Sequence, residues 1–545
     1  MDAPLLSFNY FKYLLISILL TGVFLGSSHA KTSNKLIPSA PEQNSITERI
    51  NDSFIGDLKD IRQRRILRVL VSYNRTNFFN TVKGQRGLEY DLLKAYEKYL
   101  NRGPRKERYK THIMFLATPF NDLFSELNAG RGDIIASGLT ITPERLELTD
   151  FTKPYITGVQ EILVSSKEER KIEKIEELSG QQVIAVANSS YIVHIERVNQ
   201  ALGRQGLAPI EIIHADPVLE AEDLLEMVNA GLFKYTVVDN HIAEIYQKTF
   251  TNLQLQNQIV FHNGGKIGWA INKNLPQLKK SLNDFIRTYA RPGKLLGNTV
   301  FQKYFKNPFW INKPLSLTAL DETPCLKYYF EKYASFYDFD WLLIASQAYQ
   351  ESRFQHDLVS PAYARGIMQI KRSTARSKIV GIPNIDNIED NIHAGIRYLA
   401  FLRDHYFDKP EYTKEDTLNF ALAAYNAGPG RIRKLQREAE AQGLDPNKWF
   451  YNVEALARKS IGHETVNYVT QIQKTTIGLR SSIALSTDKV RLKEQQIKAH
   501  KINTTNMKKI SNRTVPGVQN SKKDAKSRFP LIETEIKFNK EKLTK

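Results

Sequence analysis

One glutamate in an otherwise apolar stretch of the chain has the setting of an acid–base catalyst. It lies in Ala348-Tyr349-Gln350-Glu351-Ser352-Arg353-Phe354, and no second acid stands at a fixed spacing beside it. Burial raises the pKa of such a carboxyl, because the anion is disfavoured away from water. The acid form then persists near neutral pH and can protonate a glycosidic oxygen, which is otherwise a poor leaving group. These residues favour an enzyme that cleaves glycans.

Further motifs around Glu351 give this setting a family resemblance. Residues 326–480 resemble the lysozyme-like domain of soluble lytic murein transglycosylases. The matching pieces follow one another in the order Glu351-Ser352; Ser360-Pro361-Ala362 with Gly366-Ile367-Met368-Gln369; Thr374-Ala375; Asn391-Ile392 with Gly395 and Tyr398-Leu399; Ala424-Tyr425-Asn426-Ala427-Gly428; and Glu464-Thr465 with Tyr468-Val469. Each piece is weak alone, but six in register over about 150 residues are specific.

The resemblance implies a mechanism and a set of site residues. Glu351 acts first as acid and then as base, while the N-acetyl group of the substrate assists in place of a second carboxylate. The 6-hydroxyl of muramic acid closes on C1 and leaves a 1,6-anhydromuramoyl end. The residues assigned to substrate binding are Ser352, Met368, Gln369, Tyr425, Asn426 and Tyr468.

Three other positions are assigned differently. Asn391 and Gly395 are expected to be structural, as a cap and a close-packing residue. Tyr363 departs from the family, whose members usually carry a small residue there. The sequence therefore does not settle the shape of one rim of the groove. Endo- and exo-cleavage therefore cannot be distinguished.

The N-terminal half resembles a different family. Residues 66–305 are similar to periplasmic amino-acid-binding proteins of the extracellular solute-binding family 3 type. The similarity runs through Gly87-Leu88-Glu89-Tyr90-Asp91, Gly132 to Arg145, Thr149 to Tyr155 and Gly268-Trp269-Ala270-Ile271.

This second resemblance implies a ligand site between two lobes. Arg145 would fork onto a ligand carboxylate, the planar geometry that guanidinium favours. Asp239 would take the ligand ammonium. The groups expected to support them are Gly138, Thr140, Ser189 and Ser190. Two alternatives stay open: the domain kept the fold but lost the ligand, or Arg145 pairs with the nearby acid Glu144.

The elements that position these residues follow from hydrophobic pattern. Strands are predicted at 67–71, 133–136, 183–186 and 235–239, and a helix over 90–96. Alternating strands and helices indicate parallel sheets in two lobes. Helices are predicted over 341–349, 395–405 and 417–425, with few strand signals from 326 to 479. The predicted fold is a two-lobed α/β periplasmic-binding-protein-like domain, followed by an all-α lysozyme-like domain and a disordered basic tail.

The ends of the chain carry their own signals. An apolar run from Tyr13 to Leu25 follows Lys12 and precedes Ser28-His29-Ala30, as in a cleavable signal peptide; a short membrane anchor is the alternative. No cysteine follows the run, which excludes lipidation there. The predicted boundaries are 1–30 for the signal peptide, 31–60 for a linker, 61–308 for the solute-binding domain, 320–482 for the lysozyme-like domain and 487–545 for the tail.

Composition limits the partners. The 545 residues carry a net charge of +19, and the segment 488–545 holds 16 Lys/Arg against 6 Asp/Glu. Such a charge favours polyanions, but no nucleic-acid motif accompanies it, so nucleic acid is not expected. Cys325 is the only cysteine, and the histidines show no ligand spacing, so we expect no metal and no cofactor. The tail is expected to be a solvated segment; binding to anionic wall polymer or lipid is the alternative.

The order of the two halves resembles the membrane-bound lytic murein transglycosylase F family, over residues 66–480. This implies a periplasmic enzyme, peripheral to the outer membrane, that acts on peptidoglycan glycan strands, with an amino acid or muropeptide bound by the N-terminal domain. Two other functions remain: a periplasmic solute sensor with a degenerate lysozyme-like domain, and a hydrolytic muramidase. The identity of the bound amino acid and the oligomeric state are not readable from the sequence.

Overall fold

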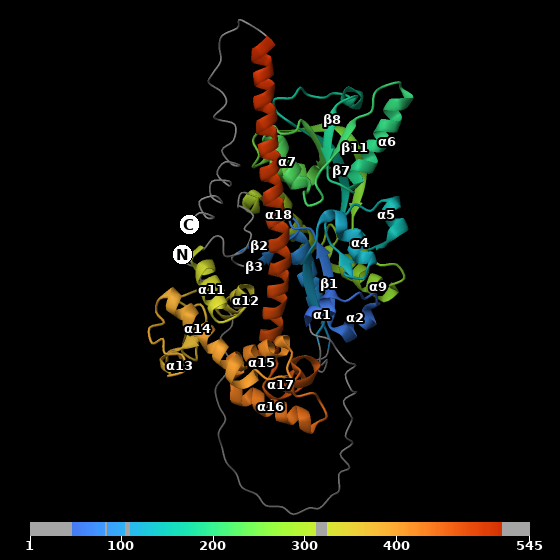
Figure 1. The fold of residues 1–545 in the computed structure, drawn as a ribbon. Helices are drawn as coiled ribbons and strands as arrows, with labels where there is room; N and C mark the ends of the chain where they lie inside the picture. Colours follow the sequence, from blue (N-terminus) through green and yellow to red (C-terminus); the bar gives the residue numbers. More distant parts are fainter. Residues whose placement is uncertain (1–45, 82–83, 104–109, 312–323, 515–545) are drawn as a thin grey trace, which may run out of the picture. The chain divides into compact units, whose positions relative to one another are not determined.

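The two halves of the chain differ in architecture. The computed structural model describes residues 46–81, 84–103, 110–311 and 324–514. The chain up to Ile311 forms two α/β lobes, each built on a five-stranded sheet, and the chain from Pro324 forms helices and one small hairpin (Figure 1). The predicted two-lobed α/β domain followed by a helical domain is confirmed.

The first lobe has the strand order β4-β1-β5-β12-β6. Its interior strand β1 pairs in parallel with β4 and β5, and all six residues of β1 are buried, as expected for a strand covered on both faces. The elements of this lobe are β1 Ile66–Val71, β2 Phe79–Thr81, β3 Gly84–Arg86, α3 Leu88–Leu100, β4 His112–Ala117, α4 Leu123–Asn128, β5 Ile134–Ile135, α5 Pro143–Leu148, β6 Asp150–Phe151, β12 Ala270–Ile271, α9 Pro276–Phe285 and α10 Leu295–Phe301.

The second lobe has the order β11-β7-β10-β8-β9. Two long strands, β7 and β11, leave and re-enter the first lobe, and the Tyr155 N–H donates to the Ile267 carbonyl (3.0 Å) where they cross between the lobes. The elements are β7 Ile156–Ser166, β8 Gln182–Ala185, α6 Ser190–Arg204, β9 Glu211–His214, α7 Ala221–Asn229, β10 Tyr235–Asp239, α8 Asn240–Gln247 and β11 Leu253–Ile267.

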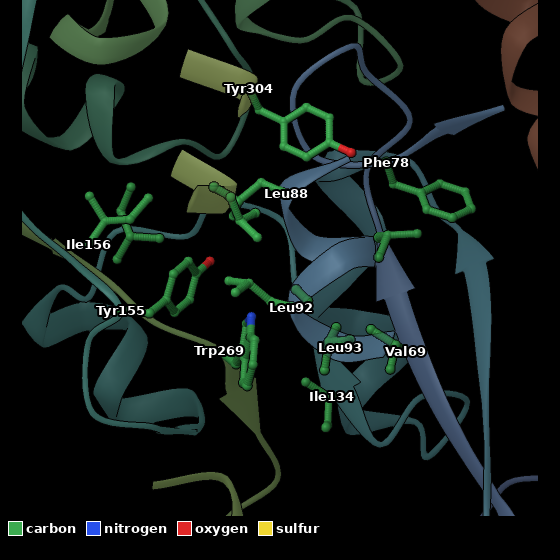
Figure 2. Packing of buried hydrophobic residues seen from close by; sticks show 14 of the residues in the cluster. Val69, Phe78, Leu88, Leu92, Leu93, Ile134, Tyr155, Ile156, Trp269 and Tyr304 are labelled. Atoms are coloured by element: carbon green, nitrogen blue, oxygen red, sulfur yellow. The ribbon is translucent and has the colours of Figure 1, made fainter. Parts of the chain in front are cut away.

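The core of the first lobe explains why α3 forms where it does. Leu88 and Leu92 stand four residues apart, so they share one face of the helix. Figure 2 shows Leu92 beside the Trp269 ring, and Leu93 beside Val69 of β1 and Ile134 of β5. All of these side chains are buried, and their burial fixes α3 on the sheet.

The helical domain is arranged around α12 (Trp341–Ser352). Residues 342–348 of this helix are all buried, which is the pattern of a helix inside a core rather than on a surface. The remaining elements are α11 Pro324–Phe336, β13 Ala364–Arg365, β14 Ile370–Lys371, α13 Arg372–Arg376, α14 Ile388–Leu402, α15 Lys414–Ala427, α16 Pro429–Ala441, α17 Glu454–Ser460 and α18 His463–Thr514.

The structure differs from the sequence predictions at two connections. The expected linker, 31–60, contains α1 (Ile46–Asn51) and the start of α2 (Leu58–Arg64). The tail was expected to be disordered from 487, but α18 continues to Thr514. Lys489 and Lys493 of α18 pair with acids of α7, a long-range contact that a count of polar residues does not detect.

Parts of these predictions lie outside the described residues, namely the signal peptide, 31–45 and 515–545. Within the described ranges, no helix is both long and apolar enough to cross a membrane.

Candidate active site and solute cleft

Glu351 stands in the last turn of α12, where the buried helix reaches the edge of the core. The helix begins at Asp340, whose carboxylate accepts a hydrogen bond from the Leu342 N–H (2.9 Å). It ends where Arg353 takes a left-handed conformation with φ of 57°. Glu351 is half-buried, so its carboxyl is partly removed from water.

A phenol from the beginning of α18 holds this carboxyl. The Tyr468 hydroxyl donates to Oε1 of Glu351 (2.5 Å) and accepts from Nε2 of Gln347 (3.2 Å). Burial raises the pKa of Glu351 to about 7; the hydrogen bond from Tyr468 opposes the rise and the charge of Glu464 adds to it. The protonated form of this carboxyl is therefore available near neutral pH.

A short hairpin, β13–β14, lies next to the end of α12. The Ser352 hydroxyl is buried and donates to the Ile367 carbonyl (2.8 Å), which ties α12 to the hairpin. Nε2 of Gln369 donates to the carbonyls of Leu358 (3.0 Å) and Gly366 (2.9 Å). In this structure Ser352 and Gln369 therefore hold the hairpin in shape, and their direct contact with substrate stays a prediction.

Asn391 fixes the same hairpin from behind. Its Oδ1 accepts from the Met368 N–H (2.9 Å), and its Nδ2 donates to the carbonyls of Arg365 (3.0 Å) and Ile385 (3.3 Å). The prediction that Asn391 is a cap is wrong, because Asn387 caps α14 and Asn391 lies within the helix. Its buried amide is used to satisfy the polar groups of the hairpin.

Two glycines make the close packing between the hairpin and α14 possible. A Cβ on Gly366, which has φ of +75°, would lie 2.3 Å from Nδ2 of Asn391, and one on Gly395 would lie 2.4 Å from Cβ of Met368. The predicted close-packing role of Gly395 is confirmed.

The remaining predicted residues come from α15. The Tyr425 hydroxyl donates to the Met368 carbonyl (2.7 Å), so it joins α15 to the hairpin. Asn426 is exposed, and its Oδ1 accepts from the Thr465 hydroxyl (2.7 Å) of α18. Tyr363, the departure from the family, is 77% exposed with φ of 62°. The site thus joins α12, the hairpin, α15 and α18 around one carboxyl.

All six residues predicted for the solute cleft line one cavity between the two lobes: Gly138, Thr140, Arg145, Ser189, Ser190 and Asp239. Arg145 and Asp239 come from opposite lobes, as expected. Burial lowers the pKa of Arg145 to about 10, so the guanidinium is charged at neutral pH. Burial and the charge of Glu161 raise the pKa of Asp239 well above the usual range.

The bonds around Arg145 exclude its pairing with Glu144. Arg145 donates to the carbonyls of Thr140 (2.8 Å) and Asn188 (3.4 Å), whereas Glu144 pairs with Arg197 (2.6 Å). The bond to Asn188 crosses the cleft, and so does the bond from Nδ2 of Asn74 to Glu220 (2.7 Å). The lobes are therefore closed on each other.

Some cleft groups are committed to the protein itself. The Gly138 N–H donates to Oε1 of Glu89 (3.0 Å), and the Ser190 hydroxyl donates to Glu161 (2.7 Å). The Ser189 hydroxyl donates to the Val186 carbonyl (2.6 Å). That Arg145 and Asp239 bind the charged ends of a ligand stays a prediction.

Comparison with known proteins identifies both halves. The transglycosylase SLT domain matches residues 328–447, and the bacterial extracellular solute-binding proteins, family 3, match residues 67–307. A membrane-bound lytic murein transglycosylase F of Maricaulis maris is 30% identical over 433 residues, which cover 76% of this chain and 90% of that protein. This chain belongs to the membrane-bound lytic murein transglycosylase F family.

Two further similar proteins are a relative with the same name and a solved structure. The transglycosylase F of Desulfosudis oleivorans is 28% identical over 430 residues, covering 76% of this chain and 89% of that protein. Among solved structures, an ancestral amino-acid-binding protein that is a precursor of cyclohexadienyl dehydratase matches 46% of this chain and 99% of its own length, at 24% identity and a TM-score of 0.37.

Sequence reasoning missed several polar residues of the cleft in this member of the transglycosylase F family. Glu220, Glu222 and His241 line the cavity beside Asp239. The two glutamates precede or open a helix, where acids are common as caps, so the sequence carried no distinct signal for them. Within the described ranges, no group of three or more His, Cys, Asp or Glu is arranged to hold a metal ion.

Proposed function

We propose that this peptidoglycan lytic transglycosylase cleaves the β-1,4 bond between N-acetylmuramic acid and N-acetylglucosamine and leaves a 1,6-anhydromuramoyl end. Glu351 donates its proton to the glycosidic oxygen as the bond from C1 to that oxygen breaks, and the substrate N-acetyl group assists at C1. The carboxylate then takes the proton of the muramic acid 6-hydroxyl as O6 bonds to C1. The proton returns to Glu351 and no water is consumed.

The observation that carries this proposal is the half-buried Glu351 held by Tyr468. A pKa of about 7 suits a group that has to give up a proton and regain one in each turnover. The phenol of Tyr468 can keep donating to the carboxylate in the middle of the cycle, when the charge is present. A single carboxyl can therefore serve both steps.

The geometry of the site supports the proposed substrate contacts. Asn426 is exposed beside α18 and can offer its amide to an acetamido group, and the Tyr425 hydroxyl donates to the Met368 carbonyl of the hairpin. Gln369 and Met368 place the hairpin backbone along the sugar, and Ser352 sets the position of the hairpin relative to Glu351.

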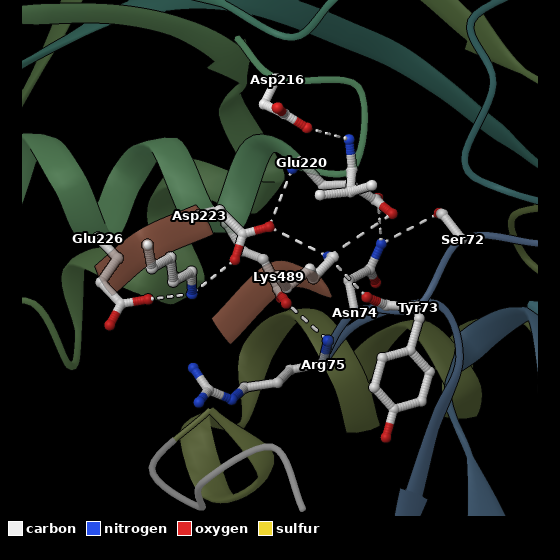
Figure 3. A network of polar contacts seen from close by, with 12 residues as sticks. Ser72, Tyr73, Asn74, Arg75, Asp216, Glu220, Asp223, Glu226 and Lys489 are labelled. Atoms are coloured by element: carbon white, nitrogen blue, oxygen red, sulfur yellow. Dashed lines mark hydrogen bonds and ion pairs between the residues drawn. The ribbon is translucent and has the colours of Figure 1, made fainter. Parts of the chain in front are cut away.

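We also propose that a ligand in the solute cleft alters the catalytic domain through α18. Tyr468, near the beginning of this helix, contacts Glu351. The helix continues to the first lobe, where Lys474 pairs with Glu97 of α3 (2.8 Å). Further along, Nζ of Lys489 donates to the Tyr73 carbonyl (2.8 Å) of the first lobe and to Asp223 (3.1 Å) of the second (Figure 3). One helix therefore contacts both lobes and the catalytic acid.

These contacts make α18 sensitive to cleft opening. Tyr73 and Asp223 belong to different lobes, so Lys489 cannot keep both partners when the lobes separate. A ligand that favours the closed cleft would stabilise α18 in the arrangement that holds Tyr468 on Glu351. Coupling of this kind requires that the ligand bind the two states with different affinity.

The location proposed for the enzyme is the periplasm, peripheral to the outer membrane. The apolar segment 13–25 and the Ala30 cleavage site support export, and the net charge of +19 supports association with anionic surfaces. The names of the curated relatives, which are membrane-bound lytic murein transglycosylases, are consistent with this location.

Digestion of purified sacculi tests the enzymatic proposal. Glu351→Gln should lower the rate of muropeptide release about 10³-fold, because general acid and base catalysis together contribute roughly 10² to 10⁴. Glu438→Gln, which removes a surface carboxylate of α16 in the same domain, should act like the wild type. Wild-type protein that releases nothing, or Glu351→Gln that releases muropeptides at the wild-type rate, would show that the chain is a sensor with a degenerate lysozyme-like domain or uses another acid.

A further inference from the structure

The wall of the solute cleft carries more negative charge than an amino-acid zwitterion needs. Its charged residues are one cation, Arg145, and three acids, Glu220, Glu222 and Asp239, all of them buried. The Arg145–Asp239 pair already matches the carboxylate and ammonium of a zwitterion. Glu220 and Glu222 are then left over. Lys489, together with Arg75 at Glu222, offsets their charge only in part, since the pKa of each glutamate stays raised.

Lysines of α18 form ion pairs with the acids just behind this wall. Asp223 lies 3.1 Å from Nζ of Lys489 and 2.6 Å from Nζ of Lys493, which also pairs with Glu226 (2.7 Å). Figure 3 shows Lys489 between Asp223 and Glu220. Glu220 lies farther from Lys489, at 3.8 Å.

Glu220 and Glu222 are held differently. Glu220 accepts a hydrogen bond from Nδ2 of Asn74 (2.7 Å), so it is partly satisfied. One oxygen of Glu222 accepts from the Arg75 N–H (2.9 Å) and from the Tyr246 hydroxyl, which fixes the carboxyl in place. Its other oxygen, Oε1, accepts no hydrogen bond within the described part of the chain.

Two more polar atoms in the same wall share this property. Among the described residues, Oδ1 of Asp239 and Nδ1 of His241 also have no hydrogen-bond partner. Glu222, Asp239 and His241 are 5%, 2% and 6% exposed, and all three line the cavity. Burial lowers the pKa of His241 to about 3, so the ring is neutral and one of its nitrogens is an acceptor.

An unpartnered buried acceptor is unfavourable, and these acceptors belong to one cavity. A ligand with hydrogen-bond donors at Asp239 and at Glu222 would satisfy both carboxyl oxygens. A neutral, apolar side chain would supply only the first. Burial also raises the pKa of Glu220, to about 7, and that of Glu222, as expected where acids outnumber cations.

We propose that the cleft binds an amino acid, or the end of a peptide, whose side chain carries a second cation. The α-carboxylate lies on Arg145, the α-ammonium on Asp239, and the side-chain ammonium or guanidinium on Glu222, with Glu220 and His241 beside it. This inference rests on the amino-acid-binding role proposed above and adds the class of side chain. It makes Glu222 the residue that determines specificity.

Isothermal titration of the purified protein with matched pairs of amino acids tests the proposal. L-lysine is compared with L-norleucine and L-arginine with L-citrulline, since each pair has a similar shape and differs in the cation. At least one cationic member should bind about tenfold or more tightly than its neutral partner. Neutral partners that bind as tightly as the cationic ones would overturn the inference and leave the amino-acid-binding role intact.

Variants separate specificity from general binding. Glu222→Gln should reduce the preference for the cation to within about threefold, and the neutral amino acids should bind as before. Glu226→Gln is the matched control, because Glu226 lies on the same helix, outside the cavity, and pairs with Lys493. A Glu222→Gln protein that keeps the full preference would overturn the role of Glu222.

Two further outcomes of these experiments have to be interpreted: an unfolded variant and a protein that binds no amino acid. If Glu222→Gln unfolds, as judged by thermal unfolding without ligand, the wild-type pairs still decide the proposal. If no amino acid binds, both the side-chain class and the amino-acid-binding role are overturned. Sacculus digestion by the same preparation shows whether the enzymatic function nevertheless stands.

Discussion

The catalytic site and the solute cleft both bury carboxyl groups, but the hydrogen-bond partners of these groups differ. In the catalytic site a single carboxyl, Glu351, is held by the phenol of Tyr468 at 2.5 Å. In the cleft Glu220, Glu222 and Asp239 share one cavity, and an oxygen of both Glu222 and Asp239 has no partner among the described residues. The first arrangement keeps one proton available for transfer. The second favours a bound cation.

The comparison shows that a raised pKa does not by itself identify a catalyst. The pKa of Glu351 and that of Glu220 are both raised to about 7, and burial is the first cause of each. Their neighbours differ, since Glu351 has a hydroxyl donor and Glu220 has Asn74, Lys489 and further acids. The number of acids and the unpartnered acceptors distinguish binding from catalysis.

The largest effect on stability is expected at Lys489 of α18, the helix that joins the catalytic site to the two lobes of the cleft. Lys489→Met removes the cation that contacts Tyr73 and Asp223, and Asp223 and Glu220 then lose a buried partner. Breaking a buried ion pair from one side costs about 3 kcal/mol in the free energy of unfolding. The urea transition should shift to lower concentration, and an amino acid that binds should no longer change the cleavage rate.

Arg491→Met is the control for this variant, because Arg491 lies on the same helix with its side chain 64% exposed. It should stay close to the wild type in both measurements. A Lys489→Met protein as stable as Arg491→Met, and still responsive to the amino acid, would separate the two regions and contradict the role of α18.

The next largest effect, a loss of ligand affinity, distinguishes the solute cleft from the catalytic site. Arg145→Ala removes the guanidinium that is expected to bind the α-carboxylate, and a charge-assisted pair of hydrogen bonds is worth about 2 to 3 kcal/mol. Affinity for every α-amino acid should fall about 100-fold by isothermal titration. Glu351→Gln should leave the same affinities unchanged. Equal binding by Arg145→Ala and wild type would show that the cleft reads its ligand in another way.

A smaller effect is expected at Tyr468. Tyr468→Phe removes the donor to Glu351, and a hydrogen bond to a charged group of about 1.5 kcal/mol corresponds to roughly a tenfold loss of rate. The hydrogen bond lowers the pKa of Glu351, so its removal should raise this pKa and move the alkaline limb of the pH–rate profile upward. A profile that does not move would indicate that the hydroxyl only supports the fold.

The smallest change is in the wild-type pH profile itself. Glu351 has to be protonated to begin the reaction, and its pKa is about 7, above its ordinary value of 4.5. The rate should therefore fall as the pH rises through 7 and be retained at pH 6. Sacculus digestion between pH 5 and pH 9 measures this. A rate that falls only below pH 5 would mean that the reaction needs the carboxylate from the start.

The sequence predicted the motif residues better than the contacts that join the domains. Glu351, Arg145 and Asp239 stand in recognisable motifs, and the strands and helices that carry them follow from local patterns. Glu222 and Lys489 stand in polar segments without any motif, and their roles depend on contacts more than 100 residues away, such as that of Lys489 with Asp223. Burial and pairing across that distance decide what these residues do, and a linear pattern does not contain either.

The most direct test of the account is the chemistry of the newly formed ends. Purified protein digests sacculi in water enriched in oxygen-18, and the released muropeptides are analysed by mass spectrometry. If Glu351 serves as both acid and base, the products carry 1,6-anhydromuramoyl ends without the heavy isotope. Reducing ends that contain oxygen-18 would show that water attacks C1, and the enzyme would then be a hydrolytic muramidase.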